Sequence, residues 1–558
     1  MSIYDERPWL SQSAERKPPD IELEYATGLE MFRATAERHA DDPAIHYFDS
    51  TITYRELDEI TDALAVGLIE HGFQPGDRIA VYLQNVPQFV VTMLASWKAG
   101  GIMVSVNPML KERELTTLLT DSGARALVTL ESLWREVAKA VVPNTDVDIA
   151  ITTSELDCLD GQVPPLLEGS SRDRDEGTVD LLELVESHRG ERPPEPTLSA
   201  DDVAFLTYTS GTTGPPKGAM NTHRNVTFNS QAYRDWIGLG PDDVLYGVAP
   251  LFHITGLVGH IGVCMLTGMP LVLSYRLDPD VALELIEQYG VTFTVGSITV
   301  FIALMNAPTA NERDVSSFKK IVSGGAPIAP PTVEAFERQF GAYIHNIYGL
   351  TETTSPSHCV PFGMRAPVDE ASGALSVGVP IFNTVVRVVD DDDNDLPPGE
   401  VGEIVTSGPQ VVPGYWNQPE ETEHAIPSGR LHTGDVGLMD EKGWFYIVDR
   451  KKDMINAAGY KVWPREVEDV LYGHESVREA AAVGVPDPYR GETVKAFVSL
   501  KPGAQEDPEG LISFCKERMA AYKYPRQIEF IDELPKTVSG KVLRRELRAQ
   551  EAAKAGTS

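Results

Sequence analysis

The first hundred residues alternate between helical and strand patterns of apolar positions. From Thr53, "TYRELDEITDALAVGLIEHG" carries apolar residues on one helical face, a capping box of Thr53 with Glu56 at its start, and Gly72 after its end. A strand at 77–83 ("DRIAVYL"), a helix at 86–101 and a strand at 102–107 ("IMVSVN") follow. Strands that alternate with helices are typical of a parallel sheet, so we predict an α/β fold with mostly parallel sheets.

The pattern changes twice further along the chain. Residues 141–200 contain no aromatic residue and include "EGSSRDRDEG" and "GERPPEP", which predicts that this segment is partly a surface excursion. Alternation resumes at 318–349, where "FKKIVSGGA", "PPTVEAFERQF" and "YIHNIYG" predict a strand, a helix and a strand.

Beyond residue 370 the patterns are short and strand-like. The stretch "TVVRVVDDDDNDLPPGEVGEIVTSG" predicts a hairpin whose acidic run at 390–393 is a solvated turn and not a cation site. A last segment with its own apolar pattern opens at Arg450. We therefore expect a large N-terminal domain of several subdomains, residues 1–449, and a small mobile α+β domain, residues 450–558.

Length and charge narrow the classes of function. The chain has 558 residues, of which 42% are hydrophobic, so it can bury more than one core. Its 48 lysines and arginines against 83 acidic residues give a formal charge of -35. Phosphate repels such a surface, which disfavours binding to nucleic acid or to an anionic membrane.

The compartment is indicated by the cysteines and the first residues. The four cysteines are far apart and form no C-x-x-C pair, which predicts neither a zinc site nor a disulfide framework. The start "MSIYDERPWLSQ" has no apolar core segment, so we expect no signal peptide. Both observations favour the cytoplasm.

The uncharged stretch 254–273, "ITGLVGHIGVCMLTGMPLVL", is about long enough to span a bilayer. It contains His260, several glycines and Pro270, and it has no basic flanks. We therefore predict a buried helix followed by a buried strand, with no transmembrane span.

Residues 206–220, "LTYTSGTTGPPKGAM", combine hydroxyls, glycines and one lysine in a single loop. Such a loop at the end of a strand can wrap a phosphate with N–H and O–H donors while the lysine supplies charge. The spacing is not that of a Walker loop, because Gly218 follows Lys217 in place of Ser or Thr. Alone, the loop is equally consistent with a glycine-rich surface turn.

Five motifs in order place the loop in a known family. "YTSGTTGPPKG", "YGLTETT", "HTGDVG", "DRKKDMI" and "PKTVSGK" resemble the adenylate-forming superfamily of acyl-CoA synthetases, coumarate-CoA ligase and firefly luciferase, over residues 25 to 548. The resemblance implies that ATP and a carboxylic acid form an acyl-adenylate and pyrophosphate. The thiol of coenzyme A then displaces AMP.

The resemblance also assigns the nucleotide site. The phosphate loop would be Thr209, Ser210, Gly211, Thr212, Thr213, Gly214 and Lys217, with Thr209 near magnesium. Glu352 would hold Mg²⁺ beside Thr351, since one carboxylate with phosphate oxygens and waters suits that cation. The adenine and ribose contacts would be Gly324, Gly325, Ala326, Asn346, Tyr348, Gly349, Asp435 and Arg450. Tyr348 taken alone is nearly as consistent with a core residue.

The acyl side is marked by His253 in "APLFHITG", where the family has a gate beside the carboxylate. A lone histidine in an apolar run is equally consistent with a core residue. No aspartate is present there to meet an ammonium group, which disfavours an amino acid substrate. The apolar, mostly non-aromatic "VGSITVFIALMN" favours a medium- or long-chain fatty acid.

In the C-terminal domain, Lys541 matches the lysine that reaches the α-phosphate, Lys452 the hinge, and Gly459 the glycine beside which pantetheine passes. Asn456 departs from the lysine that luciferase-like members have. The resemblance implies ATP, Mg²⁺ and coenzyme A as cofactor and cosubstrates. It leaves open an aryl-CoA ligase, a ligase that loads a separate carrier protein, and either a monomer or a homodimer.

Overall fold

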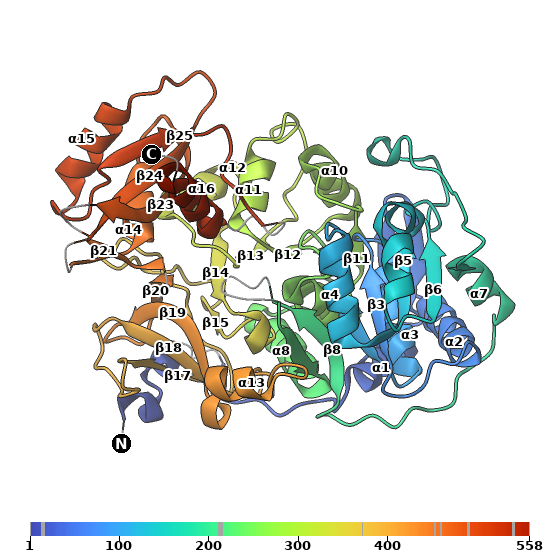
Figure 1. Ribbon diagram of the computed structural model, residues 1–558. Coiled ribbons are helices and arrows are strands. Elements are labelled where there is room, and N and C mark those ends of the chain that lie inside the picture. The colour runs from blue at the N-terminus through green and yellow to red at the C-terminus, as the bar shows by residue number, and fades with distance from the viewer. Residues whose placement is uncertain are drawn as a thin grey trace.

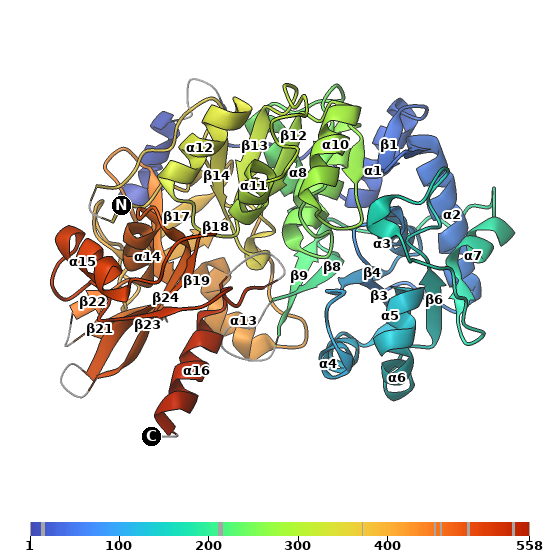
Figure 2. The ribbon, with the colours of Figure 1, turned by 90° about the horizontal axis from the view of Figure 1, so that it is seen from above.

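The chain is organised around four β-sheets in the part that the structure describes, residues 2–12, 17–209, 216–370, 372–450, 453–457, 460–487, 491–537 and 542–556. The structure is a computed structural model. Figures 1 and 2 show the two large sheets with their helices on one side of the molecule, and the two smaller sheets on the other.

The seven-stranded sheet is parallel except at its last pair, β8–β9. In spatial order its strands are β7 (Val179–Asp180), β6 (Ile149–Thr153), β5 (Ala124–Leu130), β3 (Arg78–Tyr82), β4 (Ile102–Ser105), β8 (Val203–Tyr208) and β9 (Gly218–Thr222). The helices of this part are α2 (Tyr54–Glu70), α3 (Pro87–Lys98), α4 (Glu112–Ser122), α5 (Glu131–Leu133), α6 (Lys139–Val141) and α7 (Leu181–Ser187).

The nine-stranded sheet has a parallel centre and antiparallel edges. Its order is β16 (Val379–Pro380), β15 (His358–Cys359), β14 (Ile344–Tyr348), β13 (Lys320–Ser323), β12 (Phe293–Gly296), β10 (Leu245–Tyr246), β11 (Leu271–Leu273), β1 (Pro43–Tyr47) and β2 (Ser50–Thr53). The associated helices are α1 (Gly28–Arg38), α8 (His223–Ile237), α9 (Val263–Thr267), α10 (Pro279–Tyr289), α11 (Ile298–Met305) and α12 (Pro330–Phe340).

The two smaller sheets are mainly antiparallel. The first consists of β17 (Val385–Val389), β18 (Gly402–Ser407), β19 (Leu431–Met439) and β20 (Phe445–Arg450), with α13 (Pro419–Ala425) between β18 and β19 in the chain. The C-terminal sheet contains β21 (Ile455–Ala457), β22 (Tyr460–Val462), β23 (Val477–Asp487), β24 (Gly491–Leu500) and β25 (Gln527–Phe530). Its helices are α14 (Pro464–Tyr472), α15 (Pro508–Arg518) and α16 (Arg544–Gly556).

Local sequence signals account for several of these elements. The capping box of Thr53 and Glu56 begins α2, and Gly72 follows the helix with a φ of +94°. The predicted strand, helix and strand of 318–349 are β13, α12 and β14, and Val333, Phe336 and Phe340 of α12 are buried. The α/β fold class with mostly parallel sheets and a smaller C-terminal part is confirmed.

The predictions for residues 254–273 and 141–200 can be compared with the structure. Residues 254–273 form a π-helix (Thr255–Gly262), α9 and β11, which are buried except at Thr255, and no helix within the described ranges is long and apolar enough to cross a membrane. Residues 141–200 are only partly a surface excursion. Residues 157–178 are largely exposed, but β6 is an interior strand of the seven-stranded sheet, because its short apolar alternation pairs in parallel with β5.

The N-terminal residues pack far from the elements that follow them in sequence. The 3-10 helices at Ile3–Glu6 and Pro8–Gln12 lie against the β17–β20 sheet, as Figure 1 shows for the N-terminus. The Tyr4 hydroxyl donates to the carbonyl of Leu396 at 2.8 Å, and the Trp9 ring contacts Phe445 edge-on. Both rings are fully buried, so this segment completes the core of that sheet.

Candidate active site

The phosphate-loop segment is the connection of the β8–β9 hairpin. The N–H of Thr209 donates to the carbonyl of Lys217 at 2.9 Å, and the N–H of Lys217 lies 3.4 Å from the Thr209 hydroxyl oxygen. These bonds close the base of the loop. Ser210, Gly211, Thr212, Thr213 and Gly214 lie outside the described residues.

A chain of polar contacts leads from Lys217 to Glu352. The Lys217 ammonium pairs with the Glu421 carboxylate and lies 5.0 Å from the centre of the Tyr415 ring. The Tyr415 hydroxyl donates to Glu352 Oε1 at 2.7 Å. Burial and the nearby Glu352 carboxylate raise the pKa of Tyr415, so the phenol remains a donor. The structure thus joins the predicted phosphate lysine to the predicted magnesium ligand.

The turn that carries Thr351 and Glu352 is held by two buried asparagines of the β9–α8 region. Asn221 donates its amide N–H to the carbonyl of Thr351 at 3.2 Å and to the Thr354 hydroxyl at 3.0 Å. Asn229 donates to the carbonyls of Thr353 and Thr354 at 2.9 and 2.8 Å. Side-chain donors therefore fix a turn whose carbonyls have no strand partner.

The predicted adenine contacts meet at the carboxyl ends of β13 and β14. Gly324, Gly325 and Ala326 directly follow β13, and a Cβ on Gly324 would lie 2.7 Å from Ile347 Cγ1. Gly325 has a φ of +77°, which favours glycine. Asn346 of β14 donates its amide N–H to the carbonyl of Ser376 at 3.0 Å, so its accepting atom toward a ligand would be Oδ1.

The predicted ribose contacts lie beside them. The Tyr348 hydroxyl donates to Asp435 Oδ2 at 2.7 Å, and Asp435 of β19 is the direct cross-strand partner of Arg450 in β20. Tyr348 is only half-buried, and its neighbour Gly349 is packed closely against the turn at Ser355. The structure therefore brings Tyr348, Asp435 and the backbone of Arg450 together from three strands.

Buried His358 supports the Tyr348 ring from behind. Their ring centres are 5.4 Å apart, edge-on, and the Ser357 hydroxyl lies 2.9 Å from His358 Nδ1. Full burial lowers the pKa of His358 to about 3. The ring is neutral at ordinary pH and acts as packing for the tyrosine.

His253 lies in the turn that leads into the π-helix Thr255–Gly262. It is half-buried, and the N–H of Thr255 lies 3.4 Å from its Nδ1. This position is more open than that of fully buried His260, whose Nε2 accepts from the N–H of Ala249. The gating role of His253 stays a prediction.

The C-terminal residues predicted to act lie outside the described residues: Lys452, Gly459 and Lys541, as do the side chains of Arg450 and Asn456. The chain is described again from residue 542, and Arg544 at the start of α16 is surrounded by carboxylates. Arg544 Nη2 contacts Glu468 at 2.7 Å, and Nη1 lies 3.4 and 3.6 Å from Asp453 and Asp449. These contacts join α16, α14 and β20.

Sequence reasoning did not find Tyr415, Glu421, Asn221 or Asn229. Tyr415 and Glu421 lie in "GYWNQPEET", a stretch with no apolar period and an ordinary composition for a surface turn. Its pairing with β9 could not be expected from either segment alone. The two asparagines follow the loop motif by only a few residues, but Asn221 lies in β9 and Asn229 in α8, so no periodicity indicates that both face the Glu352 turn.

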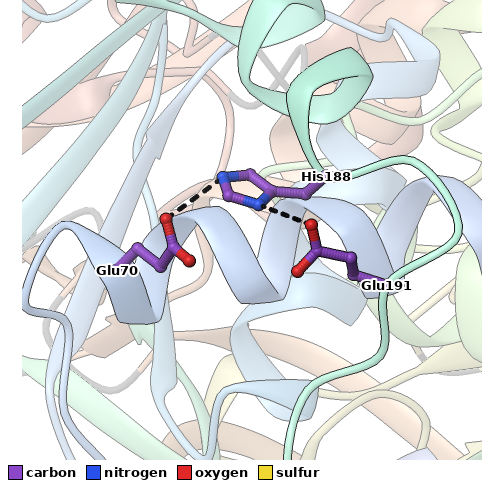
Figure 3. A group of neighbouring side chains, drawn as sticks. All are labelled: Glu70, His188 and Glu191. Atoms are coloured by element: carbon purple, nitrogen blue, oxygen red, sulfur yellow. Dashed lines mark ion pairs between the residues drawn. The ribbon is translucent and has the colours of Figure 1, made fainter.

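A separate group of titratable residues joins α2 to the end of α7 (Figure 3). His188 lies between two glutamates, with Nε2 3.7 Å from Glu70 and Nδ1 3.6 Å from Glu191. The His188 ring thus contacts a carboxylate at the end of α2 and another that follows α7. One carboxylate oxygen of each glutamate and one ring nitrogen of His188 lie within 4.8 Å of one another, a spacing at which the three residues could hold a metal ion.

Fold and site together define a class of protein. Residues 32–416 match the AMP-binding enzyme family and residues 466–541 match the AMP-binding enzyme C-terminal domain. The chain belongs to this family and is an adenylate-forming acyl-CoA synthetase.

Individual relatives cover nearly the whole chain. It is 37% identical to a long-chain-fatty-acid–CoA ligase of Bacillus subtilis over 98% of this chain and 99% of the relative. It is 36% identical to a feruloyl-CoA synthase of an Amycolatopsis species, over 92% and 97% of the two chains. A crystal structure of an anthranilate CoA ligase with anthranoyl-AMP matches with a TM-score of 0.85 at 25% identity, over 97% and 99% of the chains.

Proposed function

We propose that the protein activates a medium- or long-chain fatty acid with ATP and transfers the acyl group to coenzyme A. The observation that carries this proposal is 37% identity to a long-chain-fatty-acid–CoA ligase over nearly all of both chains. The apolar, mostly non-aromatic stretch 295–306 supports an aliphatic substrate. The feruloyl-CoA synthase at 36% identity keeps an aryl acid as the second candidate.

Magnesium fits the donor set at the phosphate side. Thr209 offers a hydroxyl and Glu352 a carboxylate already oriented by Tyr415, and hard oxygen donors of this kind suit Mg²⁺. When bound, the ion would neutralise charge on the phosphates of ATP. In this proposal Lys217 and the loop 209–214 hold the β- and γ-phosphates, and Thr351 lies beside the reacting phosphate.

The remaining roles follow the geometry of the strand ends. Gly324, Gly325 and Ala326 would form the surface on which adenine lies, with Tyr348 stacked on it and Asn346 Oδ1 as acceptor. Asp435 would accept from the ribose hydroxyls with Arg450 beside it. His253 would close the acyl side.

The C-terminal domain would supply the other catalytic groups. In this proposal Lys541 meets the α-phosphate while the carboxylate attacks, and the domain then pivots at Lys452 to bring Gly459 beside the pantetheine arm. Arg544, three residues after Lys541, is bound to Glu468 of α14, so Lys541 would move together with the C-terminal domain. The four free cysteines and the strong negative charge support a cytoplasmic enzyme.

Pyrophosphate release across carboxylic acids of increasing length, with and without coenzyme A, tests the proposal. Each buried methylene contributes about 0.8 kcal/mol, so we expect kcat/KM to rise a few-fold per carbon and then level off. Ferulate and coumarate provide the comparison. If kcat/KM does not depend on chain length and is higher for the aryl acids, the substrate is an aryl acid. If coenzyme A does not change the rate of pyrophosphate release, the acceptor is a separate carrier protein.

A further inference from the structure

Glu421 forms an ion pair with Lys217, the lysine that would bind the phosphates of ATP. Its carboxylate pairs with the Lys217 ammonium, and the pairing lowers the pKa of Glu421. A lysine ammonium carries a single positive charge, which a carboxylate and a phosphate would have to share. A bound triphosphate and Glu421 therefore compete for the same group.

The competing carboxylate is held in place by the backbone and not by chance contact. The segment 414–416 pairs with β9, directly after the loop: the N–H of Met220 donates to the Gly414 carbonyl at 3.0 Å and the N–H of Trp416 donates to the Gly218 carbonyl at 2.8 Å. The N–H of Tyr415 donates to the Thr422 hydroxyl at 2.9 Å, which fixes the start of α13. Glu421 precedes Thr422 and is thereby presented to Lys217.

The position of the Tyr415 ring also bears on this competition. The ring lies 5.0 Å from the Lys217 ammonium and its hydroxyl is bonded to Glu352, so it remains in place whether or not Glu421 holds the lysine. The ammonium can move from the carboxylate to a phosphate without losing the ring. The exchange breaks the ion pair between Lys217 and Glu421 and forms a stronger one between Lys217 and the phosphate.

We propose that Glu421 is an internal competitor that sets the affinity for ATP and pyrophosphate by holding Lys217 when the phosphate site is empty. The inference rests on the proposed role of Lys217 in phosphate binding. It distinguishes the ligands of the reaction: ATP and pyrophosphate must displace Glu421, whereas AMP carries no β- or γ-phosphate and need not. Glu421 thereby favours release of pyrophosphate after adenylation.

The test compares Glu421→Gln with Glu423→Gln, which removes the same charge from an exposed position of the same helix. The side chains of Glu421 and Lys217 are 49% and 26% exposed, and pairs of this exposure change an equilibrium by about two- to five-fold. We expect Glu421→Gln to lower the KM for ATP and the inhibition constant of pyrophosphate by this common factor. The dissociation constant of AMP should not change, and Glu423→Gln should leave all three constants unaltered.

Lys217→Ala separates the inference from the function on which it rests. If Lys217→Ala weakens ATP binding while Glu421→Gln changes neither ATP nor pyrophosphate, Glu421 is not a competitor. Weaker ATP binding in Glu421→Gln would mean that the carboxylate positions the lysine, which also overturns the inference. If Lys217→Ala leaves ATP binding intact, the assignment of the phosphate site itself is wrong. If Glu421→Gln strengthened the binding of AMP as much as that of ATP, Glu421 would act only through the overall charge of the site, and the inference would be wrong.

Discussion

Tyr415 contacts two predicted site residues through different atoms. Its hydroxyl orients one oxygen of Glu352, while its ring lies under the Lys217 ammonium. A phenylalanine would keep the ring and remove only the hydroxyl. The two contacts can therefore be separated by a single substitution.

We predict that Tyr415→Phe raises the Mg²⁺ concentration needed for half-maximal adenylation by about ten-fold, since groups that orient a metal ligand contribute on that order to affinity. The KM for ATP at saturating Mg²⁺ should change much less. Tyr348→Phe is the matched control, because it removes a hydroxyl bonded to Asp435 and should affect the nucleotide without shifting the Mg²⁺ dependence. Identical magnesium titrations for the two variants would contradict the role of Tyr415.

The start of α16 is attached to α14 and β20 by a buried cluster of charge. Burial alone would lower the pKa of Arg544, but Glu468, Asp449 and Asp453 raise it. The side chains of these carboxylates are at most 10% exposed, and Glu468 also accepts from the N–H of Ala482. The helix, its neighbour helix and the strand are thus joined through one guanidinium.

We predict that Arg544→Leu destabilises the C-terminal domain by about 3–5 kcal/mol, because it leaves buried carboxylates without their principal cation. Urea unfolding followed by proteolysis of this domain measures the loss. Arg545→Leu removes a neighbouring charge from an exposed position and should cost about 0.5 kcal/mol or less. Equal stability of the two variants would show that the cluster does not hold the helix.

The elements differ in how far the sequence predicts them. The strand–helix alternation around β3, α3 and β4 is predictable because continuous apolar runs and glycine stops are local signals. The interior strand β6 was missed because it is only five residues long and lies inside a polar, aromatic-free stretch. The contact of Glu421 with Lys217 joins residues 204 apart and depends on strand pairing, which no local pattern encodes. The motif residues were predictable by family resemblance, and their partners were not.

Four buried histidines make the stability of the whole molecule depend on pH. Burial lowers the pKa to about 4 for His223 and His345 and to about 3 for His260 and His358, against 6.5 when unfolded. Below pH 6.5 the unfolded chain binds protons that the folded chain does not. The free energy of unfolding therefore falls as the pH falls from about 6.5 toward the folded values.

We predict a loss of about 1.6 kcal/mol per buried histidine between pH 6.5 and 5, a range above the titration of most carboxylates. Urea unfolding at several pH values measures it. His260→Gln keeps an acceptor for the N–H of Ala249 and takes up no proton, so its curve should be shallower by about one proton. If the free energy of unfolding of His260→Gln depended on pH as steeply as that of the parent protein, His260 would not contribute to the pH dependence.

The packing of the N-terminal segment has a consequence for synthesis on the ribosome. Tyr4 bonds to a carbonyl 392 residues later, and Trp9 contacts Phe445, so neither ring can be buried natively until the β17–β20 sheet has been translated. At about 5–20 residues per second, this interval is roughly 20 to 80 s. During that time the rings of Tyr4 and Trp9 have no native surface to pack against. The nascent chain would therefore expose these two rings to chaperones until the β17–β20 sheet is complete.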